Sequence, residues 1–184
     1  MRPARPSGTP RRSRPAGTPR ATAGAHARGA VRTARRGAPD VRRALARLAE
    51  RPGRDPELAG LLAELLRHRE RKIRLQAHRV SRQVLDRDEF LDRTTGLLDD
   101  RDPDVVRTAV RTLAYAGWAP AVPGLIGLLG HSRPVVARDA RDALVRLGEP
   151  AIPALRHAAG RARPDRRRVY EWLIERIRGG EDGC

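Results

Sequence analysis

Few side chains in this sequence could carry out catalysis or hold a metal ion. Four histidines of the central region lack the repeated partner pattern of a metal site: His68, His78, His131 and His157. Cys184 is the only cysteine and the last residue, in a glycine-rich end without a fixed base or oxyanion donor. A single cysteine also excludes an intrachain disulfide framework and a Cys-rich zinc site. The sequence therefore predicts no catalytic residue, no metal and no cofactor.

A cluster of aspartates offers a second kind of chemistry, cation binding. The cluster consists of Asp99, Asp100, Asp102 and Asp104. A calcium-binding EF-hand loop also needs a glycine at its sixth position and a distal glutamate, which this segment lacks. Asp102 and Asp104 precede an apolar periodic segment, where acids cap a helix and stabilise its first turn. We therefore expect helix capping here and no calcium site.

Arginine dominates the charged residues. The chain has 39 basic and 22 acidic residues, a formal net charge of +17, and Lys72 is its only lysine. Such a charge is typical of proteins that bind nucleic acid or another anionic surface. The near absence of lysine, together with abundant Ala, Gly and Pro, equally indicates the codon bias of a GC-rich genome. Both interpretations stay open.

The first 37 residues differ from the rest of the chain. Residues 1–37 contain ten arginines, five prolines and no acid, Leu, Ile or aromatic residue. Such a segment cannot bury enough apolar surface to offset the entropy of ordering it, so we predict a disordered basic tail. The tail could be a spacer, contact phosphates without sequence preference, carry a targeting signal, or precede the true start site.

Residues 38–178 form repeats with a spacing of about 31 residues, the feature that decides the fold. Matched pairs at this offset include Pro103 with Pro134, Arg107 with Arg138, Leu113 with Leu144, and Gly117 with Gly148. Weaker copies extend upstream to Pro39 and downstream to Pro164.

Each repeat predicts two short helices, because apolar residues recur three or four positions apart. A glycine follows the first helix, where a left-handed residue ends helices, and a proline opens the second helix. First helices are expected at about 40–50, 69–84, 103–116, 134–147 and 164–178, and second helices at about 55–67, 87–99, 120–129 and 150–159. No segment alternates with period two, so the predicted fold class is all-α.

The best repeat contains, in order, Asp102, Pro103, Val106, Arg107, Ala109, Leu113, Gly117, Pro120, Ala121, Pro123 and Leu125. This pattern resembles the HEAT-like repeats first described in phycobilisome lyases. The resemblance implies an α-solenoid of about four helix pairs plus a terminal helix, in which the second helices line a concave face. It also implies that the repeat arginines brace adjacent units through acids such as Asp104; they are Arg42, Arg74, Arg107 and Arg138. Residues 179–184 are expected to be a flexible end.

The charge distribution points to a partner site on the second helices. The first-helix segments carry a net charge of +12 and the second-helix segments a net charge of −3. The segment from Trp118 to Gly130 has no charge, and an apolar patch with a polar rim often marks a partner site. The predicted groove therefore consists of Trp118, Val122, Leu125 and Ile126, rimmed by Arg93 and Arg156. The alternative is that this helix is simply the most buried one.

Phosphate contact by the first helices is the competing prediction, since cationic clusters neutralise phosphates and release counterions. The candidate contacts are Arg69, Arg71, Lys72, Arg74, Arg166 and Arg167. A solvated basic face is the simpler interpretation of the same residues.

Our leading hypothesis is a non-enzymatic HEAT-like scaffold that binds a protein partner in its concave groove. The alternative is a nucleic-acid-associated protein that uses the tail and the convex arginines, and a weaker one is a lyase or the regulatory subunit of an enzyme. The longest apolar run is too short to span a membrane. The lack of a credible targeting signal and the unpaired cysteine predict a cytoplasmic protein, and its oligomeric state stays open.

Overall fold

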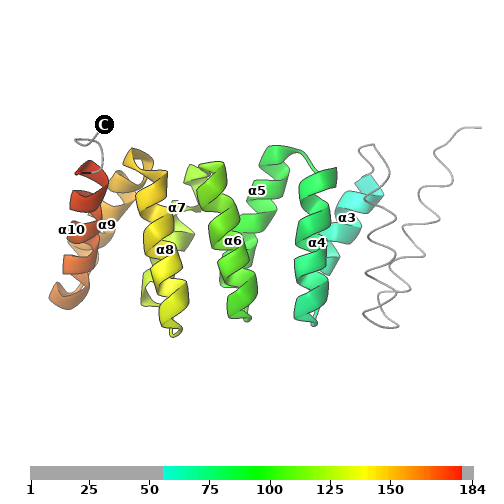
Figure 1. The fold of residues 1–184 in the computed structure, drawn as a ribbon, viewed down its shortest axis with the longest axis horizontal. Helices are drawn as coiled ribbons and strands as arrows, with labels where there is room; N and C mark the ends of the chain where they lie inside the picture. The colour runs from blue at the N-terminus through cyan, green and yellow to red at the C-terminus, as the bar shows by residue number, and fades with distance from the viewer. Residues whose placement is uncertain (1–55, 180–184) are drawn as a thin grey trace, which may run out of the picture.

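The computed structural model describes residues 56–179, and every regular element in this part of the chain is a helix (Figure 1). The α-helices are α3 (Pro56–Leu65), α4 (Arg71–Val84), α5 (Arg87–Thr95), α6 (Pro103–Ala116), α7 (Val122–Gly127), α8 (Pro134–Leu147), α9 (Ile152–Arg161) and α10 (Pro164–Arg178). Short 3-10 segments are η1 (Gly96–Asp99), η2 (Ala119–Ala121), η3 (Leu128–Gly130) and η4 (Glu149–Ala151). The all-α prediction is confirmed. The predicted tail, the first expected helix at 40–50 and Cys184 lie outside the described residues.

The helices alternate between two layers (Figure 1). Helices α4, α6, α8 and α10 form one layer, here called the first-helix layer, and α3, α5, α7 and α9 form the second-helix layer behind it. Successive pairs follow one another along the long axis of the molecule, so the predicted α-solenoid is confirmed.

Local signals in the sequence set the helix ends. The Asp102 carboxylate accepts a 3.0 Å hydrogen bond from the Asp104 backbone N–H and caps α6, with Pro103 in its first turn. Gly117 ends α6 in the left-handed region at φ 65°. There the Trp118 N–H donates to Leu113 O at 3.0 Å and the Gly117 N–H to Ala114 O at 3.3 Å, the pattern of a Schellman motif. The predicted capping roles of Asp102 and Gly117 are therefore confirmed.

The core runs along the joint between the two layers. Its fully buried members include Ile73, Leu113, Leu125, Leu144 and Leu173, one from each of five helices. Ala109 and Ala140 are also completely buried, in α6 and α8 respectively. Such small side chains let two helix backbones approach closely, so α6 and α8 pack tightly in the first-helix layer.

Candidate functional site

Arg74 is a brace between repeats and lies in the interior. Its side chain is 4% exposed, and that of its partner Asp100 is 7% exposed. The Arg74 Nε and Nη2 donate to the two Asp100 oxygens at 2.6 and 2.7 Å, and its Nη1 donates to His68 O at 2.7 Å. Such bidentate, charge-assisted bonds satisfy a buried guanidinium. This geometry supports the predicted bracing role and argues against phosphate contact by Arg74.

The other repeat arginines behave less uniformly. Arg107 donates to Asp139 at 2.8 Å, so it links α6 to α8 as Arg74 links α4 to the loop before α6. The prediction that Asp104 would serve these braces is wrong, because Asp104 pairs with Arg71 at 2.6 Å. Arg138 is exposed and has no ion pair among the described residues. Arg42 lies outside them.

Two of the predicted groove residues lie in the core. Val122 is 3% exposed and Leu125 is completely buried. They are three positions apart on the side of α7 that packs against the rest of the array, so neither side chain is available to a partner. At these two positions, α7 is uncharged because it is buried. This explanation is the alternative to a partner site that the sequence left open.

The remaining groove candidates lie nearer the surface. Trp118 and Ile126 are half-buried and pack against the edge of the core, and Arg156 is exposed. Arg93 is partly committed: its Nη1 donates to Ala59 O at 2.6 Å and its Nη2 contacts Glu89 at 2.6 Å. Arg93 thus joins α3 to α5 with a guanidinium that is partly open to solvent.

Some of the predicted phosphate contacts are held by other protein groups, and the others are exposed to solvent. Arg167 donates to Ala159 O at 3.2 Å and so caps the end of α9, and Arg71 is held by Asp104. The exposed candidates are Arg69, Lys72 and Arg166. Of the predicted phosphate contacts, only the side chains of these three make no bracing contact among the described residues.

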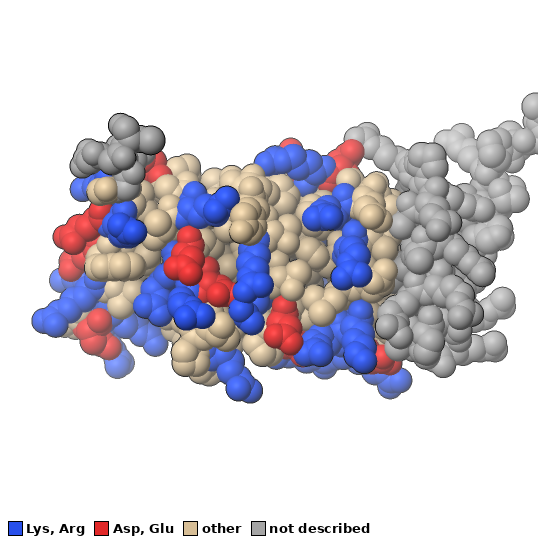
Figure 2. Space-filling view, viewed as in Figure 1, with Lys and Arg blue, Asp and Glu red and all other residues tan. Residues whose placement is uncertain are grey.

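The two layers differ in charge. The four helices of the first-helix layer contain 15 basic and 6 acidic residues. The helices of the second-helix layer, with their 3-10 segments, contain 4 basic and 7 acidic residues. Figure 2 shows basic side chains over each helix of the first-helix layer, with fewer acidic ones among them.

A buried histidine was not anticipated from the sequence. His78 is 7% exposed on α4, its ring lies 5.1 Å from that of Phe90, and its Nε2 has no hydrogen-bond partner among the described residues. Burial, with a smaller contribution from the charge of Arg82, lowers the pKa of His78 to about 4. His78 is therefore a neutral core residue at neutral pH. The only sign of this burial in the sequence was that His78 falls on the apolar face of the predicted helix.

Two surface hollows lie where α4 meets the neighbouring helices. One, of about 710 Å³, lies beside the Arg74–Asp100 pair and mixes arginines with the acids Asp92 and Asp99. The other, of about 670 Å³, lies between α4 and α6 with α5 at its base, and its charged lining residues are all arginines. We call the second one the α4–α6 groove. The sequence could not reveal it, because it depends on the distance between two helices.

The described residues include no group of three or more metal-binding side chains. Among the same residues, no helix has the length and apolar content needed to cross a bilayer.

Comparison with known proteins supports the repeat assignment. Residues 91–175 match the family model of HEAT repeats. A 53-residue segment, 29% of this chain, is 43% identical to the phycocyanobilin lyase subunit beta of Nostoc sp. (strain PCC 7120 / SAG 25.82 / UTEX 2576). That match spans 26% of the length of the relative.

A solved structure, that of an engineered protein, also resembles this chain. The two share 20% sequence identity over 77% of this chain and 73% of the engineered one, with a TM-score of 0.43. The repeat signature, the two-layer array and the match over residues 91–175 together show that this chain contains HEAT-like repeats.

Proposed function

We propose that this chain is a non-enzymatic scaffold that binds a protein partner through its second-helix layer. The observation that carries the proposal is the uncharged stretch of η2, α7 and η3 at the centre of that layer. It lies between α5 and α9, both of which carry charged residues. HEAT repeats commonly mediate protein interactions, which fits this arrangement.

The contact surface that we propose is smaller than the one expected from the sequence. Its apolar centre consists of Trp118 and Ile126, which are half-buried, together with the exposed Pro123. Arg93 and Arg156 supply the polar rim. An apolar centre inside a polar rim is the usual anatomy of a protein interface, and Trp and Arg are enriched at its energetic centre. Val122 and Leu125 position α7 from beneath.

Site-specific crosslinking tests this proposal. A photoreactive residue at position 126 should capture a defined protein, and the same group at Arg141 on the first-helix layer should not. With the captured protein purified, Arg156→Glu and Ile126→Gln should each weaken its binding about tenfold or more by calorimetry, while Arg141→Glu leaves it unchanged. Binding that survives both second-layer variants, in proteins with unaltered melting temperature, would refute the assignment.

Nucleic-acid association is the second candidate, favoured by the charge of the first-helix layer and by the exposed Arg69, Lys72 and Arg166. Fluorescence anisotropy with short duplexes and single strands, from low to physiological salt, tests it. Loss of affinity in an Arg69→Glu/Lys72→Glu variant would support it. Binding that resists this change, or that disappears with removal of residues 1–37, would assign the contact elsewhere.

A lyase or regulatory subunit is a third candidate, based on the partial match to a phycocyanobilin lyase subunit. It predicts that the chain takes up phycocyanobilin, which absorption spectroscopy after mixing and gel filtration would detect. A chromophore that elutes entirely apart from the protein would contradict it.

A further inference from the structure

The α4–α6 groove is lined by residues of α4, α5 and α6, and none of them belongs to the surface proposed above. Figure 1 shows α4 and α6 standing farther apart than α6 and α8, with α5 behind the gap. The groove is lined by the end of α4 with the following Leu85, by the first half of α5, and by α6 from Thr108 onward. Its lining residues are Arg82, Leu85, Arg87, Phe90, Leu91, Thr108, Arg111, Thr112, Tyr115 and Ala116.

The position of the braces explains why this joint is open at one end. The pairs Arg71–Asp104 and Arg74–Asp100 tie the first half of α4 to the start of α6 and the loop before it. At the other end Arg87 joins the two repeats, since its Nη2 donates to Ala116 O at 2.8 Å. The joint is therefore held at the start of the helices and leaves a hollow at their ends.

The floor of the groove is apolar and its rim is basic. Phe90 and Leu91 are buried beneath the groove, so the apolar surface that a ligand can reach comes from the half-buried Leu85 and Ala116. None of the lining residues is an acid. Arg82 and Arg111 stand on opposite sides of the hollow, on α4 and α6, and the Arg111 side chain is 58% exposed. Figure 2 shows uncharged surface between the basic groups over α6 and those over α4.

The hydrogen-bond chemistry of the rim selects for an anion. The Thr108 and Thr112 hydroxyls donate to backbone oxygens of their own helix, at 2.7 and 2.8 Å, so their protons are already used. The donors that face an incoming group are therefore the guanidinium N–H groups and the Tyr115 phenol. Arg111 is only loosely held, since its contact with Asp139 measures 3.5 Å, whereas Arg107 binds the same oxygen at 2.8 Å.

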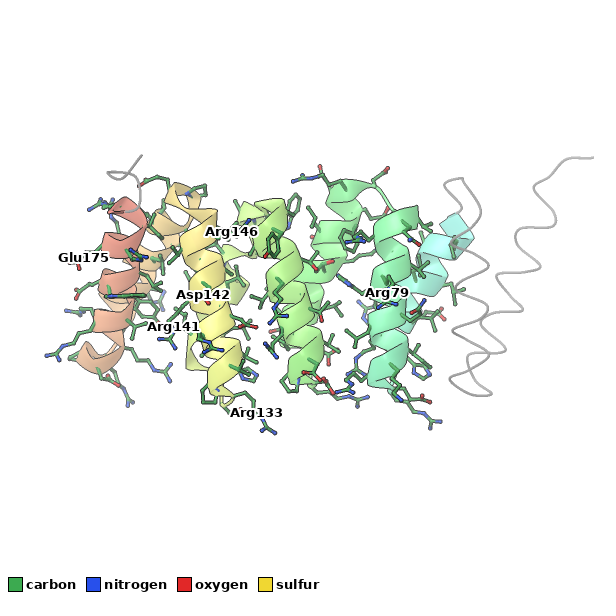
Figure 3. The ribbon with its side chains drawn as sticks, viewed as in Figure 1. Arg79, Arg133, Arg141, Asp142, Arg146 and Glu175 are labelled. Atoms are coloured by element: carbon green, nitrogen blue, oxygen red, sulfur yellow. The ribbon has the colours of Figure 1, made fainter. Side chains whose placement is uncertain are left out.

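Tyr115 adds an aromatic contact that is already fixed in place. Its side chain is 74% exposed, the most exposed large apolar residue among those described, and Arg146 of α8 lies 4.2 Å from its ring centre (Figure 3). The guanidinium restrains the ring from the α8 side by a cation–π contact and leaves the other side for a ligand. Tyr and Arg, together with Trp, are enriched among the residues that contribute most to binding at protein interfaces.

From this chemistry we infer that the α4–α6 groove binds an acidic peptide segment that carries apolar side chains. Carboxylates of the segment pair with Arg82 and Arg111, and its apolar side chains cover Leu85, Ala116 and the Tyr115 ring. A nucleic acid would satisfy the arginines but would leave the apolar surface of Leu85 and Ala116 without a matching group. The chain's own residues 1–37 do not fit, because they contain ten arginines and no acid.

Fluorescence anisotropy with labelled peptides on the full-length protein tests this inference. The probe is a peptide that alternates Glu or Asp with Leu or Phe, compared with three others. One replaces the acids by Lys, one replaces the apolar residues by Gly, and one carries phosphoserine in place of the acids. We expect the acidic–apolar peptide to bind with strong salt dependence, the Lys peptide not to bind, and the Gly peptide to bind at least tenfold more weakly. Binding of the phosphoserine peptide in place of the carboxylate one would identify the anion as phosphate.

Matched variants separate the groove from the general charge of the protein. Arg82→Glu/Arg111→Glu should reduce affinity at least tenfold and Tyr115→Ser about threefold or more. The control Arg138→Glu/Arg141→Glu makes the same charge change on exposed positions of α8 and should leave affinity within about twofold. Equal losses in the two double variants, no binding of any acidic peptide, or tighter binding of a single-stranded oligonucleotide would each overturn the inference. None of these outcomes depends on Ile126 or Arg156, so the second-layer proposal is tested separately.

Discussion

At the scale of single residues, the charged side chains of this protein serve two separate purposes. Arg74 and Asp100 are buried and completely paired, while arginines such as Arg82 and Arg138 are exposed to solvent. A buried guanidinium is tolerated only where carboxylate and carbonyl oxygens accept its protons. The large positive charge of the chain therefore does not translate directly into a binding surface.

Replacement of only one partner of the Arg74–Asp100 pair should strongly lower the stability of the fold. Arg74→Met leaves the Asp100 carboxylate buried without its counterion, which should lower the free energy of unfolding by about 3–5 kcal/mol. Urea denaturation measures this value. Arg71→Met removes an exposed pair and should cost at most about 1 kcal/mol. The double variant Arg74→Met/Asp100→Leu should recover much of the loss, and equal instability of the single and double variants would contradict this account.

His78 should make stability depend on pH. The unfolded side chain has a pKa of about 6.5 and the folded one of about 4, so between these values the unfolded state binds more protons. The stability that comes from a neutral, buried His78 is fully present above pH 6.5. It falls by about 3 kcal/mol in total as the pH decreases toward 4. His78→Leu should flatten this part of the stability curve measured by urea unfolding, whereas His157→Gln at an exposed site should not. Parallel curves for His78→Leu and the wild type would refute the assignment.

At the scale of helices, glycine and proline define where each element begins and ends. Gly117 adopts φ 65° at the end of α6, a conformation that costs an L-residue about 1 kcal/mol or more. Gly127, at the end of α7, has ordinary helical geometry and open space around the position of a Cβ atom. The two glycines are therefore suited to a direct comparison.

Replacement of these glycines by alanine should have opposite effects. Gly117→Ala should lower the melting temperature, because the left-handed conformation is strained by a Cβ atom. Gly127→Ala should raise stability by about 0.5–1 kcal/mol, because alanine restricts the unfolded chain and favours helix. Thermal unfolding followed by circular dichroism measures both. A loss of stability in both variants would show that Gly127 has a packing role.

At the scale of the whole molecule, the array is a row of units that touch mainly their neighbours. The two layers share one continuous core, but α10 ends the described array, with Trp172 half exposed. Stability in such an array depends on nearest-neighbour interfaces, so perturbations should remain local.

A cavity at the centre of the array and a cavity at its end should therefore destabilise different sets of helices. Leu113 and Leu173 are both completely buried, so their replacement by alanine should cost about 2–5 kcal/mol each. Hydrogen exchange should show that Leu173→Ala accelerates exchange in α9 and α10 while α4 keeps its protection. Leu113→Ala should affect α5 to α8. Uniform acceleration across the molecule in the Leu173→Ala variant would indicate one cooperative unit and contradict the local picture.

Local signals allowed most of the architecture to be predicted. The cap at Asp102, the left-handed Gly117 and the prolines that open helices depend on residues within about one turn of each other, and the repeat places the same kinds of signal about 31 residues further on. For that reason the expected helix boundaries agree with α4, α6, α8 and α10 to within two residues. The resemblance to HEAT-like repeats then supplied the two-layer arrangement.

The sequence by itself thus determined the fold class, the repeat and the helix ends, because backbone conformation follows from neighbouring residues. Only the tertiary structure decided which side chains remain available. Val122 and Leu125 are core residues because helices from other repeats cover them, and Arg74 pairs with Asp100 because the loop before α6 folds beside it. The α4–α6 groove likewise depends on the distance between helices some 30 residues apart, which packing between repeats determines.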